Sequence, residues 1–311
     1  MVLVHLDTDL GGDTDDACAL AMLLGWPDVE LVGVTTTIDP GGRRAGCVAE
    51  VLEMAGRNEI PVAAGAESSL TTLRSGWGVS DGDERYWPRP VRPRPSPPGA
   101  ALDLLARHLE QGATLVAIGP YTNLALLEIA RPGSLRGVPV VVMGGWLGPP
   151  EPGLPAWGPE MDFNVQCDTR AVELLAGSGA SLTLVPLPVT LNAHLRARDL
   201  TRLRASGSLG QLLARQAEAH GVDHKMADLG RAHAGLPDDL LNFHYDPVAC
   251  AVAVGWAGGV VDEMRLRPIL DDALLRFEPA EDGSLTRVVV ELDPADFTER
   301  WLAAVETAQR G

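Results

Sequence analysis

Runs of β-branched and aliphatic residues alternate with segments of helical periodicity along most of this chain. This alternation is typical of strand, helix, strand crossovers, which build a largely parallel sheet covered by helices. A length of 311 residues, 46% of them hydrophobic, is enough to bury a full core, so we expect one domain over residues 1–311. The pattern predicts an α/β fold with at least six strands, at residues 2–7, 31–36, 62–64, 114–118, 138–143 and 182–186.

Helices are predicted where apolar residues recur every three or four positions, first over residues 15–25 directly after the first strand. Near the end of the chain the pattern changes. Residues 274–277 and 286–292 flank the turn segment 281–284, which predicts a hairpin. Asp293-Pro294 then opens a final amphipathic helix.

Two long stretches interrupt this rhythm. Residues 71–99 are rich in glycine and proline, so we expect an irregular loop whose only large apolar groups are Trp77, Tyr86 and Trp87. Residues 220–245 carry four histidines among acidic residues, and we expect a mobile segment near an active site. Loops of this length inside compact domains are commonly lids or are disordered.

The charge balance argues against several classes of partner. The chain has 25 basic and 42 acidic residues, and the resulting net charge of −17 repels nucleic acid and anionic membranes. The N-terminal segment reaches Asp7 too early for a signal peptide or a membrane span, so a cytoplasmic location is expected. The cysteines are far apart in sequence, which predicts buried, reduced thiols.

Five aspartates follow the first strand within ten residues, in the segment D-T-D-L-G-G-D-T-D-D. Ligands of open α/β sheets bind at the carboxyl ends of the strands, and clustered carboxylates repel one another unless a cation or protons neutralise them. Oxygen ligands select calcium or magnesium. Helix capping by Asp13 and dipole compensation by Asp15 and Asp16 are the structural alternative, but they leave Asp7 and Asp9 unexplained.

Together with seven further segments, this motif resembles the inosine-uridine preferring nucleoside hydrolases, over essentially the full chain. The resemblance implies a Rossmann-like, mostly parallel sheet and a homodimeric or homotetrameric enzyme of nucleoside salvage that acts on small ribonucleosides. The further segments occur in the family's order: G-V-T-T-T (33–37), I-P-V-A-A-G (60–65), G-P-Y-T-N-L-A (119–125), V-V-M-G-G (141–145), D-F-N (162–164), V-P-L-P-V-T (185–190) and Y-D-P-V-A (245–249).

The resemblance also implies a calcium site. Asp9, Asp16 and Asp246 resemble the family's calcium-binding carboxylates, and Thr122 resembles the residue that provides a backbone carbonyl. Asp9 would also be the general base that deprotonates a calcium-held water as it attacks the anomeric carbon. Taken alone, Asp246 before Pro247 is an ordinary helix start and Thr122 an ordinary turn residue.

Ribose recognition is implied for a second set of residues. Bidentate binding of vicinal hydroxyls would favour ribose over deoxyribose, because a missing hydroxyl leaves buried polar groups unpaired. Two positions depart from the family: Asp39 stands where an asparagine usually reaches the sugar, and Asp162 replaces a glutamate. The implied sugar contacts are Asp15, Asp39, Met143, Asp162, Asn164 and Asp246.

The largest departure concerns the acid that protonates the leaving base. Tyr245 stands where members that protonate the base carry a histidine, and a phenol is a weak acid at neutral pH, although it still donates a hydrogen bond. His244, or His224 and His233 in the preceding segment, could take that part. Stacking of the base on Trp77, Trp87 or Trp157 is another possibility. Asp13 has no counterpart, since the interval before the tandem aspartates is two residues longer here.

Two other classes of function compete with a nucleoside hydrolase. A strand ending in D-x-D also opens phosphatases of the haloacid dehalogenase type, but those need a later basic residue, and the only lysine here is Lys225. The second alternative is a nucleoside or ribosyl binder that keeps the calcium site without acid catalysis, as Tyr245 and Asp39 suggest. Hydrolysis of p-nitrophenyl riboside or of p-nitrophenyl phosphate would separate the three.

Overall fold

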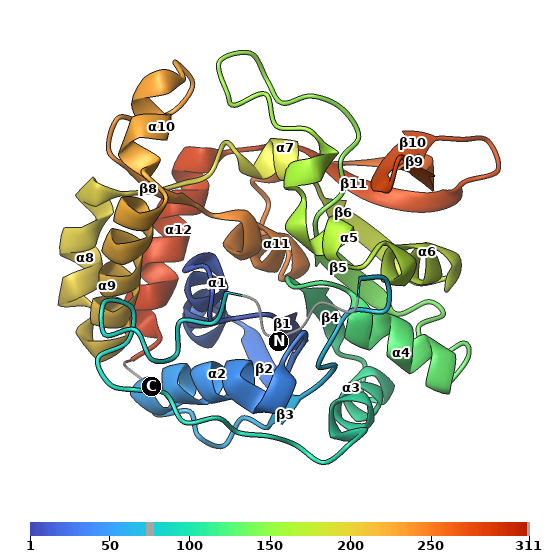
Figure 1. Cartoon of the computed structure of the whole chain (residues 1–311), viewed down its shortest axis with the longest axis horizontal. Coiled ribbons are helices and arrows are strands. Elements are labelled where there is room, and N and C mark those ends of the chain that lie inside the picture. Colours follow the sequence, from blue (N-terminus) through green and yellow to red (C-terminus); the bar gives the residue numbers. More distant parts are fainter. Residues whose placement is uncertain (73–77, 310–311) are drawn as a thin grey trace.

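A nine-stranded sheet forms the centre of the molecule in the computed structural model, which describes residues 1–72 and 78–309 (Figure 1). Its strand order is β10-β9-β11-β6-β5-β4-β1-β2-β3. A separate antiparallel pair joins β7 (His194–Arg196) to β8 (Leu240–Phe243). The strands of the large sheet are β1 (Val2–Thr8), β2 (Val29–Thr36), β3 (Val62–Ala64), β4 (Thr114–Ala117), β5 (Pro139–Met143), β6 (Ser181–Val185), β9 (Gly259–Asp271), β10 (Leu274–Pro279) and β11 (Ser284–Leu292).

The six predicted strands are confirmed as parallel strands of this sheet, from β3 to β6, each within two residues of its predicted bounds, and β11 continues the parallel pairing beside β6. Their order is that of a Rossmann-like sheet, with the direction of winding reversed between β1 and β4. Carboxyl ends of parallel strands diverge at such a switch point and leave a crevice for a ligand. Because Asp7 and Thr8 end β1, the aspartates that follow stand at this crevice.

Helices cover both faces of the sheet and bury two hydrophobic cores. One face carries α1 (Asp15–Gly25), α2 (Arg43–Met54), α11 (Tyr245–Ala253) and α12 (Pro294–Thr307), with α8 (Leu200–Ala205) and α9 (Gly207–Asp223) outside them (Figure 1). The other face carries α3 (Ala100–Glu110), α4 (Thr122–Ala130) and α6 (Thr169–Gly177). The remaining short helices are η1 (Pro40–Gly42), η2 (Pro159–Met161), α5 (Phe163–Cys167), α7 (Leu187–Thr190), η3 (Ala197–Asp199) and α10 (Met226–Ala232).

The predicted C-terminal hairpin is wrong in its pairing. The strands β10 and β11 do not pair with each other, because β9 lies between them and is antiparallel to both. The hairpin turn is Asp272-Ala273, where both residues have positive φ. The final helix is confirmed, since Asp293 caps α12 by accepting hydrogen bonds from the backbone N–H groups of Ala295 and Asp296.

The two irregular stretches behave differently. Residues 78–99 form no strand or helix in the described part of the loop, but Tyr86, Trp87 and Val91 are buried in the core beside α2. The expectation for residues 220–245 is wrong in its secondary structure: this segment contains the end of α9, all of α10 and β8. The four cysteines are buried, as predicted. Within residues 1–72 and 78–309, we find no helix with the length and apolar character needed to span a bilayer.

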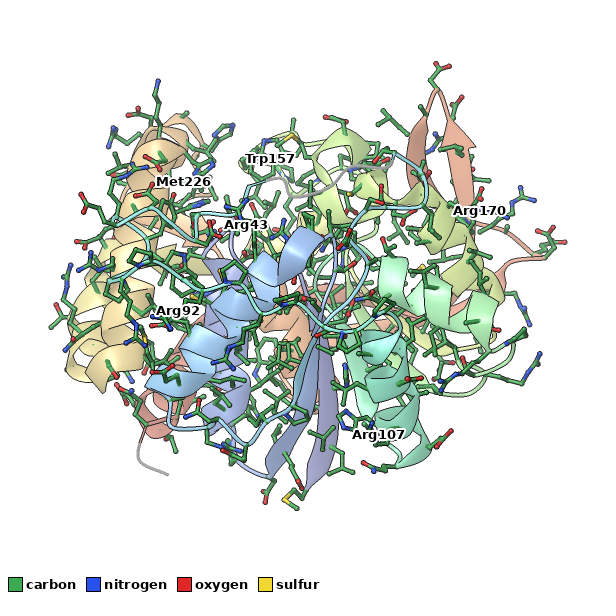
Figure 2. All side chains as sticks on the ribbon, turned by 60° about the horizontal axis from the view of Figure 1, so that its bottom comes forward. Arg43, Arg92, Arg107, Trp157, Arg170 and Met226 are labelled. Atoms are coloured by element: carbon green, nitrogen blue, oxygen red, sulfur yellow. The ribbon has the colours of Figure 1, made fainter. Side chains whose placement is uncertain are left out.

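Two glycines of the predicted motifs let backbones approach closely beside the crevice. A Cβ on Gly119 would lie 2.8 Å from both the backbone nitrogen and Oδ1 of Asp9, and a Cβ on Gly65 would lie 2.4 Å from Oδ1 of Asn123. Real Cβ atoms do not approach other atoms this closely. Figure 2 shows that Trp157 and Met226, which line the crevice, lie at one end of the molecule, opposite Arg107 of α3.

Candidate active site

A cavity of about 840 Å³ opens at the carboxyl ends of β1, β4 and β5. Its walls come from distant parts of the chain, including the aspartate segment, the loop after residue 78, the 157–164 segment, α9, α10 and the start of α11. A large concave pocket with converging polar groups is the expected place for a ligand. Of the site residues predicted from sequence, eight line it: Asp9, Asp15, Asp16, Met143, Asp162, Asn164, Tyr245 and Asp246.

Three buried carboxylates meet on one side of this cavity. Asp15 and Asp16 lie in the first turn of α1 and Asp246 in the first turn of α11, each 4% exposed. One oxygen of each lies within 4.8 Å of the others. The positive ends of two helix dipoles face the cluster and offset part of its charge. The N-cap of α11 is His244, so N-capping does not account for Asp246, whereas Asp15 and Asp16 do stand in the first turn of α1, as dipole compensation expects.

Burial governs the protonation of this cluster. It raises the pKa of Asp15, Asp16 and Asp246 well above the usual range, and repulsion from nearby carboxylates, Asp9 among them in each case, raises each pKa further. Buried carboxylates of like charge are stable only when protons or a cation neutralise them. Three carboxylate oxygens at this spacing fit a hard divalent cation such as calcium or magnesium. The donor set is therefore suited to the predicted metal.

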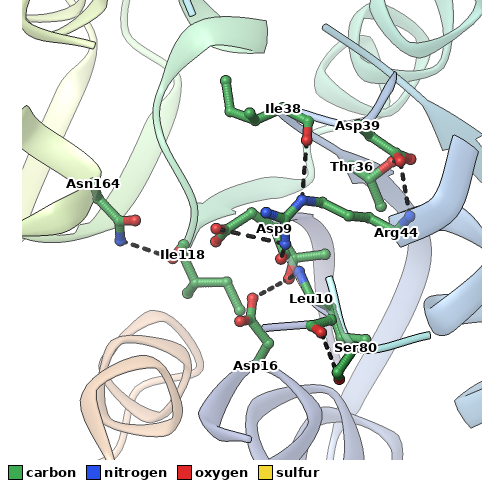
Figure 3. Close-up of polar contacts among 12 residues, drawn as sticks. Asp9, Leu10, Asp16, Thr36, Ile38, Asp39, Arg44, Ser80, Ile118 and Asn164 are labelled. Carbon is green, nitrogen blue, oxygen red and sulfur yellow. Dashed lines mark hydrogen bonds and ion pairs between the residues drawn. The ribbon is translucent and has the colours of Figure 1, made fainter. Parts of the chain in front are cut away.

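Asp9 stands beside the cluster at the end of β1, half-buried on the cavity wall. Burial raises the pKa of its carboxyl, and the Arg44 guanidinium opposes this rise. Nη1 of Arg44 lies 3.8 Å from Oδ2 of Asp9 and also donates a hydrogen bond to the Asp9 backbone carbonyl (Figure 3). Arg44 is only 2% exposed. No sequence pattern pointed to this arginine, because it lies in the first turn of an ordinary helix.

Asp7, the other unexplained aspartate, has a structural role. It lies beneath the cavity, where Oδ1 accepts hydrogen bonds from Thr35 at 2.5 Å and from Nδ2 of Asn123 at 2.7 Å. These bonds connect β1 with β2 and with the start of α4. Burial raises the pKa of Asp7 to about 7.

The amide of Asn164 is oriented by two backbone carbonyls. Its Nδ2 donates to Ile118 at 2.8 Å and to Met143 at 3.2 Å, so Oδ1 is the group available to a ligand (Figure 3). Asp162 also lines the cavity, but Oδ2 accepts from the Gly145 N–H at 2.6 Å and Oδ1 from the Val165 N–H at 3.3 Å. Burial raises the pKa of Asp162 to about 6.

Two residues predicted from the resemblance lie outside the described lining of the cavity. Asp39 is buried and its oxygens accept hydrogen bonds from Thr36 and from the backbone N–H groups of Arg44 and Ala45. This corrects the expected sugar contact, since Asp39 instead holds the start of α2. The Thr122 hydroxyl donates to Asp168 at 2.6 Å, and a metal contact through its backbone carbonyl stays a prediction.

The two adjacent candidates for protonating the base, His244 and Tyr245, lie in different surroundings. His244 is fully buried against Trp301 and Phe297, 4.3 and 5.5 Å away between ring centroids, and burial lowers its pKa to about 3. This corrects its expected role as an acid, because it belongs to the core. Tyr245 does line the cavity, but burial raises the pKa of its phenol, with nearby carboxylates adding to the rise.

The rest of the cavity wall combines candidates named from the sequence with residues that sequence analysis missed. Of the predicted candidates, His224 and Trp157 line the cavity. Neither His233 nor the core residue Trp87 is among the described residues that line it. Trp77 lies outside the described residues. Sequence analysis missed His220 and Asn242. One signal was available, because His220 and His224 are four residues apart and so share a helix face.

Asp13 connects this part of the wall to the aspartate segment. The N-cap of α1 is Thr14, not Asp13, and Oδ1 of Asp13 accepts from the Thr14 N–H at 2.5 Å and from Nδ2 of Asn242 at 2.6 Å. Nδ1 of His220 lies 3.5 Å from the same oxygen. The two extra residues of the aspartate segment thus bring a carboxylate to β8 and α9.

Comparisons with known proteins agree on one family. Residues 4–307 match the model of the inosine-uridine preferring nucleoside hydrolase family. The chain is 32% identical over 216 residues to the pyrimidine-specific ribonucleoside hydrolase RihA of Citrobacter koseri, a match that spans 66% of each protein. It is 31% identical over 247 residues to RihA of Salmonella schwarzengrund, with 76% of each protein covered.

Solved structures show the same fold. A plant nucleoside hydrolase, PpNRh1, superposes with a TM-score of 0.79 at 23% identity, covering 98% of this chain and 99% of the plant chain. A purine-preferring ribonucleoside hydrolase from Gardnerella vaginalis gives the same TM-score at 22% identity, covering 99% of this chain and 100% of that one. The mostly parallel sheet flanked by helices is therefore the arrangement of this family.

Proposed function

Since this chain belongs to the inosine-uridine preferring nucleoside hydrolase family, we propose that it hydrolyses the N-glycosidic bond of ribonucleosides with calcium as its metal. The products are ribose and the free base. The observation that carries the proposal is the meeting of Asp15, Asp16 and Asp246 within 4.8 Å in the main cavity. Two segments that are far apart in the sequence contribute carboxylates to one cluster, which is the expected arrangement for a divalent ion.

The chain's own residues provide the rest of the reaction. Asp15, Asp16 and Asp246 would hold the ion, with Asp9 beside them. A calcium ion held there would supply positive charge that neutralises the carboxylates and makes a neighbouring water easier to deprotonate. Asp9 accepts the proton of the attacking water, and Arg44 orients Asp9 through the ion pair and the backbone hydrogen bond.

Recognition of the sugar follows from the fixed polar groups around the cluster. Oδ1 of Asn164 and the carboxylate of Asp15 are acceptors for ribose hydroxyls, while the Met143 side chain packs against the ring. A 2-deoxyribonucleoside leaves one of these acceptors unpaired, so we expect it to react more slowly by a factor of roughly a hundred or more. The relatives are named for pyrimidine and for purine nucleosides, so the choice of base is left to the test below.

A first experiment measures release of base and ribose from uridine, cytidine and inosine, together with release of p-nitrophenol from p-nitrophenyl riboside. Activity should disappear after chelation and return with calcium. The Asp9→Asn enzyme should lose about a thousandfold in kcat/KM on every substrate, because loss of the general base affects any leaving group. Asp282→Asn is the matched control, since Asp282 is an exposed aspartate in the turn before β11.

The alternatives predict different results. A nucleoside or ribosyl binder without acid catalysis would bind ribose yet release no p-nitrophenol from millimolar p-nitrophenyl riboside. A phosphatase would hydrolyse p-nitrophenyl phosphate, but the only lysine, Lys225, is exposed and outside the described cavity lining. The proposal would be overturned if chelation left the wild-type activity unchanged and the Asp9→Asn enzyme were as active as the wild type.

A further inference from the structure

His220 occupies an unusual position in the cavity wall. It lies near the end of α9, is 4% exposed and lines the cavity. Its Nδ1 is buried and has no hydrogen-bond partner in the described chain, while Oδ1 of Asp13 stands 3.5 Å away. Nδ1 faces Asp13, and Asn242 also lies close enough to hydrogen-bond the ring, whose opposite nitrogen, Nε2, is directed away from Asp13. A buried polar atom without a full partner is uncommon in native proteins and calls for an explanation.

A second histidine covers the first at the cavity mouth. The rings of His220 and His224 are stacked, with centroids 4.0 Å apart and an interplanar angle of 25°. His224 is exposed and also lines the cavity. The pair therefore extends from solvent to the interior.

Charged and polar groups from three elements surround this pair. Asp13 faces His220 from the aspartate segment, Asn242 from β8, and Asp223 from the end of α9, where it also binds Arg85 and Tyr86 of the 78–99 loop. Burial lowers the pKa of His220, and the neighbouring His224 lowers it further, whereas Asp13 and Asp223 raise it. The result is a pKa below the ordinary value of 6.5.

A leaving nucleobase needs a proton donor, and the histidines of this cavity can act as one. A purine or pyrimidine that departs as an anion is a poor leaving group unless a donor protonates it. The phenol of Tyr245 donates hydrogen bonds but is a much weaker acid than an imidazolium. Among the histidines of the described chain, only His220 and His224 line the cavity.

We propose that His220 is the proton donor to the leaving base, with Asp13 as the positioning residue that holds its ring. This inference rests on the hydrolysis of ribonucleosides proposed above. Asp13 acts through His220 and touches neither the base nor the sugar. This role accounts for the two extra residues before the tandem aspartates, because they place Asp13 beside His220 of α9.

The proposed step balances in atoms and charge. The bond between C1′ and the base nitrogen breaks, its electron pair stays on the base, and the base takes the proton from Nε2 of His220. A new bond forms between C1′ and the oxygen of water, whose released proton goes to Asp9. Solvent returns a proton to His220 at the mouth beside His224 and removes the proton from Asp9. The net reaction consumes one water and yields ribose and the neutral base.

Comparison of two substrates tests this role. His220→Gln should lower kcat/KM for the best natural nucleoside by about a hundredfold, which is the usual size of one acid contribution. The loss on p-nitrophenyl riboside should stay below about tenfold, because p-nitrophenolate leaves without a proton. His233→Gln is the matched control from α10's end, outside the described cavity lining, and should retain wild-type rates on both substrates.

A pH profile separates catalysis from structure. The proton donor must be protonated, so nucleoside kcat/KM should fall as pH rises through the pKa of His220, below 6.5, and p-nitrophenyl riboside should show no such fall. Asp13→Asn removes a charge that raises this pKa, so the fall should begin at lower pH. A purely structural effect would not move it.

The possible outcomes are distinct. If the wild type hydrolyses neither substrate, the proposed function itself fails. If the wild type hydrolyses both and His220→Gln keeps its nucleoside rate, or loses both substrates equally, the role of His220 is overturned. Selective loss on the nucleoside, with the shifted profile of Asp13→Asn, supports it.

Discussion

The two ends of the cavity are built in different ways. The carboxylate end consists of Asp9, Asp15, Asp16 and Asp246, which sit at the end of one central strand and in the first turns of two packed helices. The histidine end consists of His220 and neighbours from α9, β8 and a long loop. Strand ends and first helical turns are stiff, whereas the histidine end depends on how peripheral segments pack. We infer that sugar chemistry is held rigidly and that base chemistry is the adjustable part.

Burial also acts on the two ends in opposite directions. It raises the pKa of the Asp9 carboxyl and lowers the pKa of the His220 imidazole. Both shifts favour the uncharged form of the group, as expected when water is removed. The pKa of the proposed proton acceptor, Asp9, and the pKa of the proposed proton donor, His220, are therefore shifted toward each other.

The largest expected effect tests the carboxylate end. Asp246→Asn keeps the side-chain shape but removes a charge from the three-carboxylate cluster, so we expect a loss of roughly a hundredfold or more in kcat/KM at fixed calcium. The loss should be equal for a nucleoside and for p-nitrophenyl riboside, and excess calcium should reduce it. A loss confined to the nucleoside would place Asp246 with the leaving base and would break the distinction between the two ends.

The next expected effect is a change of stability with pH, caused by a residue between β8 and α11. His244 connects β8 to α11, and its ring nitrogens have no hydrogen-bond partner in the described chain. With a folded pKa of about 3 against 6.5 when unfolded, the unfolded state alone takes up a proton between these values. The free energy of unfolding should therefore fall as pH falls from 6.5 toward 3, by about 2 kcal/mol from this group at pH 5.

Urea unfolding at pH 7 and pH 5 measures this contribution. His244→Leu should reduce the loss of stability between the two pH values by about 2 kcal/mol relative to the wild type. His233→Leu, outside the core, should keep the wild-type difference. If His244→Leu keeps it too, then His244 is not buried as a neutral group.

The smallest expected effect tests the adjustable end. The Tyr86 hydroxyl donates to Asp223 at 3.0 Å and so connects the 78–99 loop to α9. Tyr86→Phe keeps the buried ring and removes this bond, so the KM for a nucleoside should rise by roughly fivefold, while thermal stability and calcium affinity stay unchanged. A change in calcium affinity would show that the two ends are mechanically coupled.

Much of the fold was predictable because short-range patterns decide it. The six parallel strands have buried, aliphatic sequences bounded by turns, and such sequences form strands in almost any context. Strand β9 was not predicted, since it carries charged residues on both faces and includes Pro268, as edge regions of sheets often do. Its absence from the prediction led to the wrong pairing of β10 with β11.

The helices of the 207–232 region were harder to predict for a related reason. Helix α9 contains Gly207, Gly210 and Gly221, and glycine lowers the intrinsic helix preference. Packing requires Gly210, because a Cβ there would meet the backbone carbonyl of Leu203 at 2.0 Å, while a Cβ on Gly221 would press on the side chain of Leu241 at 2.9 Å. Tertiary contacts with α8 and β8 therefore override local propensity.

The sequence by itself determined the alternating fold, the strand that ends at Asp7, and the presence of several carboxylates where that strand ends. Those features depend on residues close together in the chain, whose backbone geometry is set locally. The family resemblance already named Asp246 for the metal site. Only the tertiary structure decided that Asp246 lies within 4.8 Å of Asp15 and Asp16, that Asp39 and His244 are turned away from the cavity, and that Asp13 faces His220 and Asn242. Side chains far apart in sequence meet only through packing of whole elements, which local patterns do not encode.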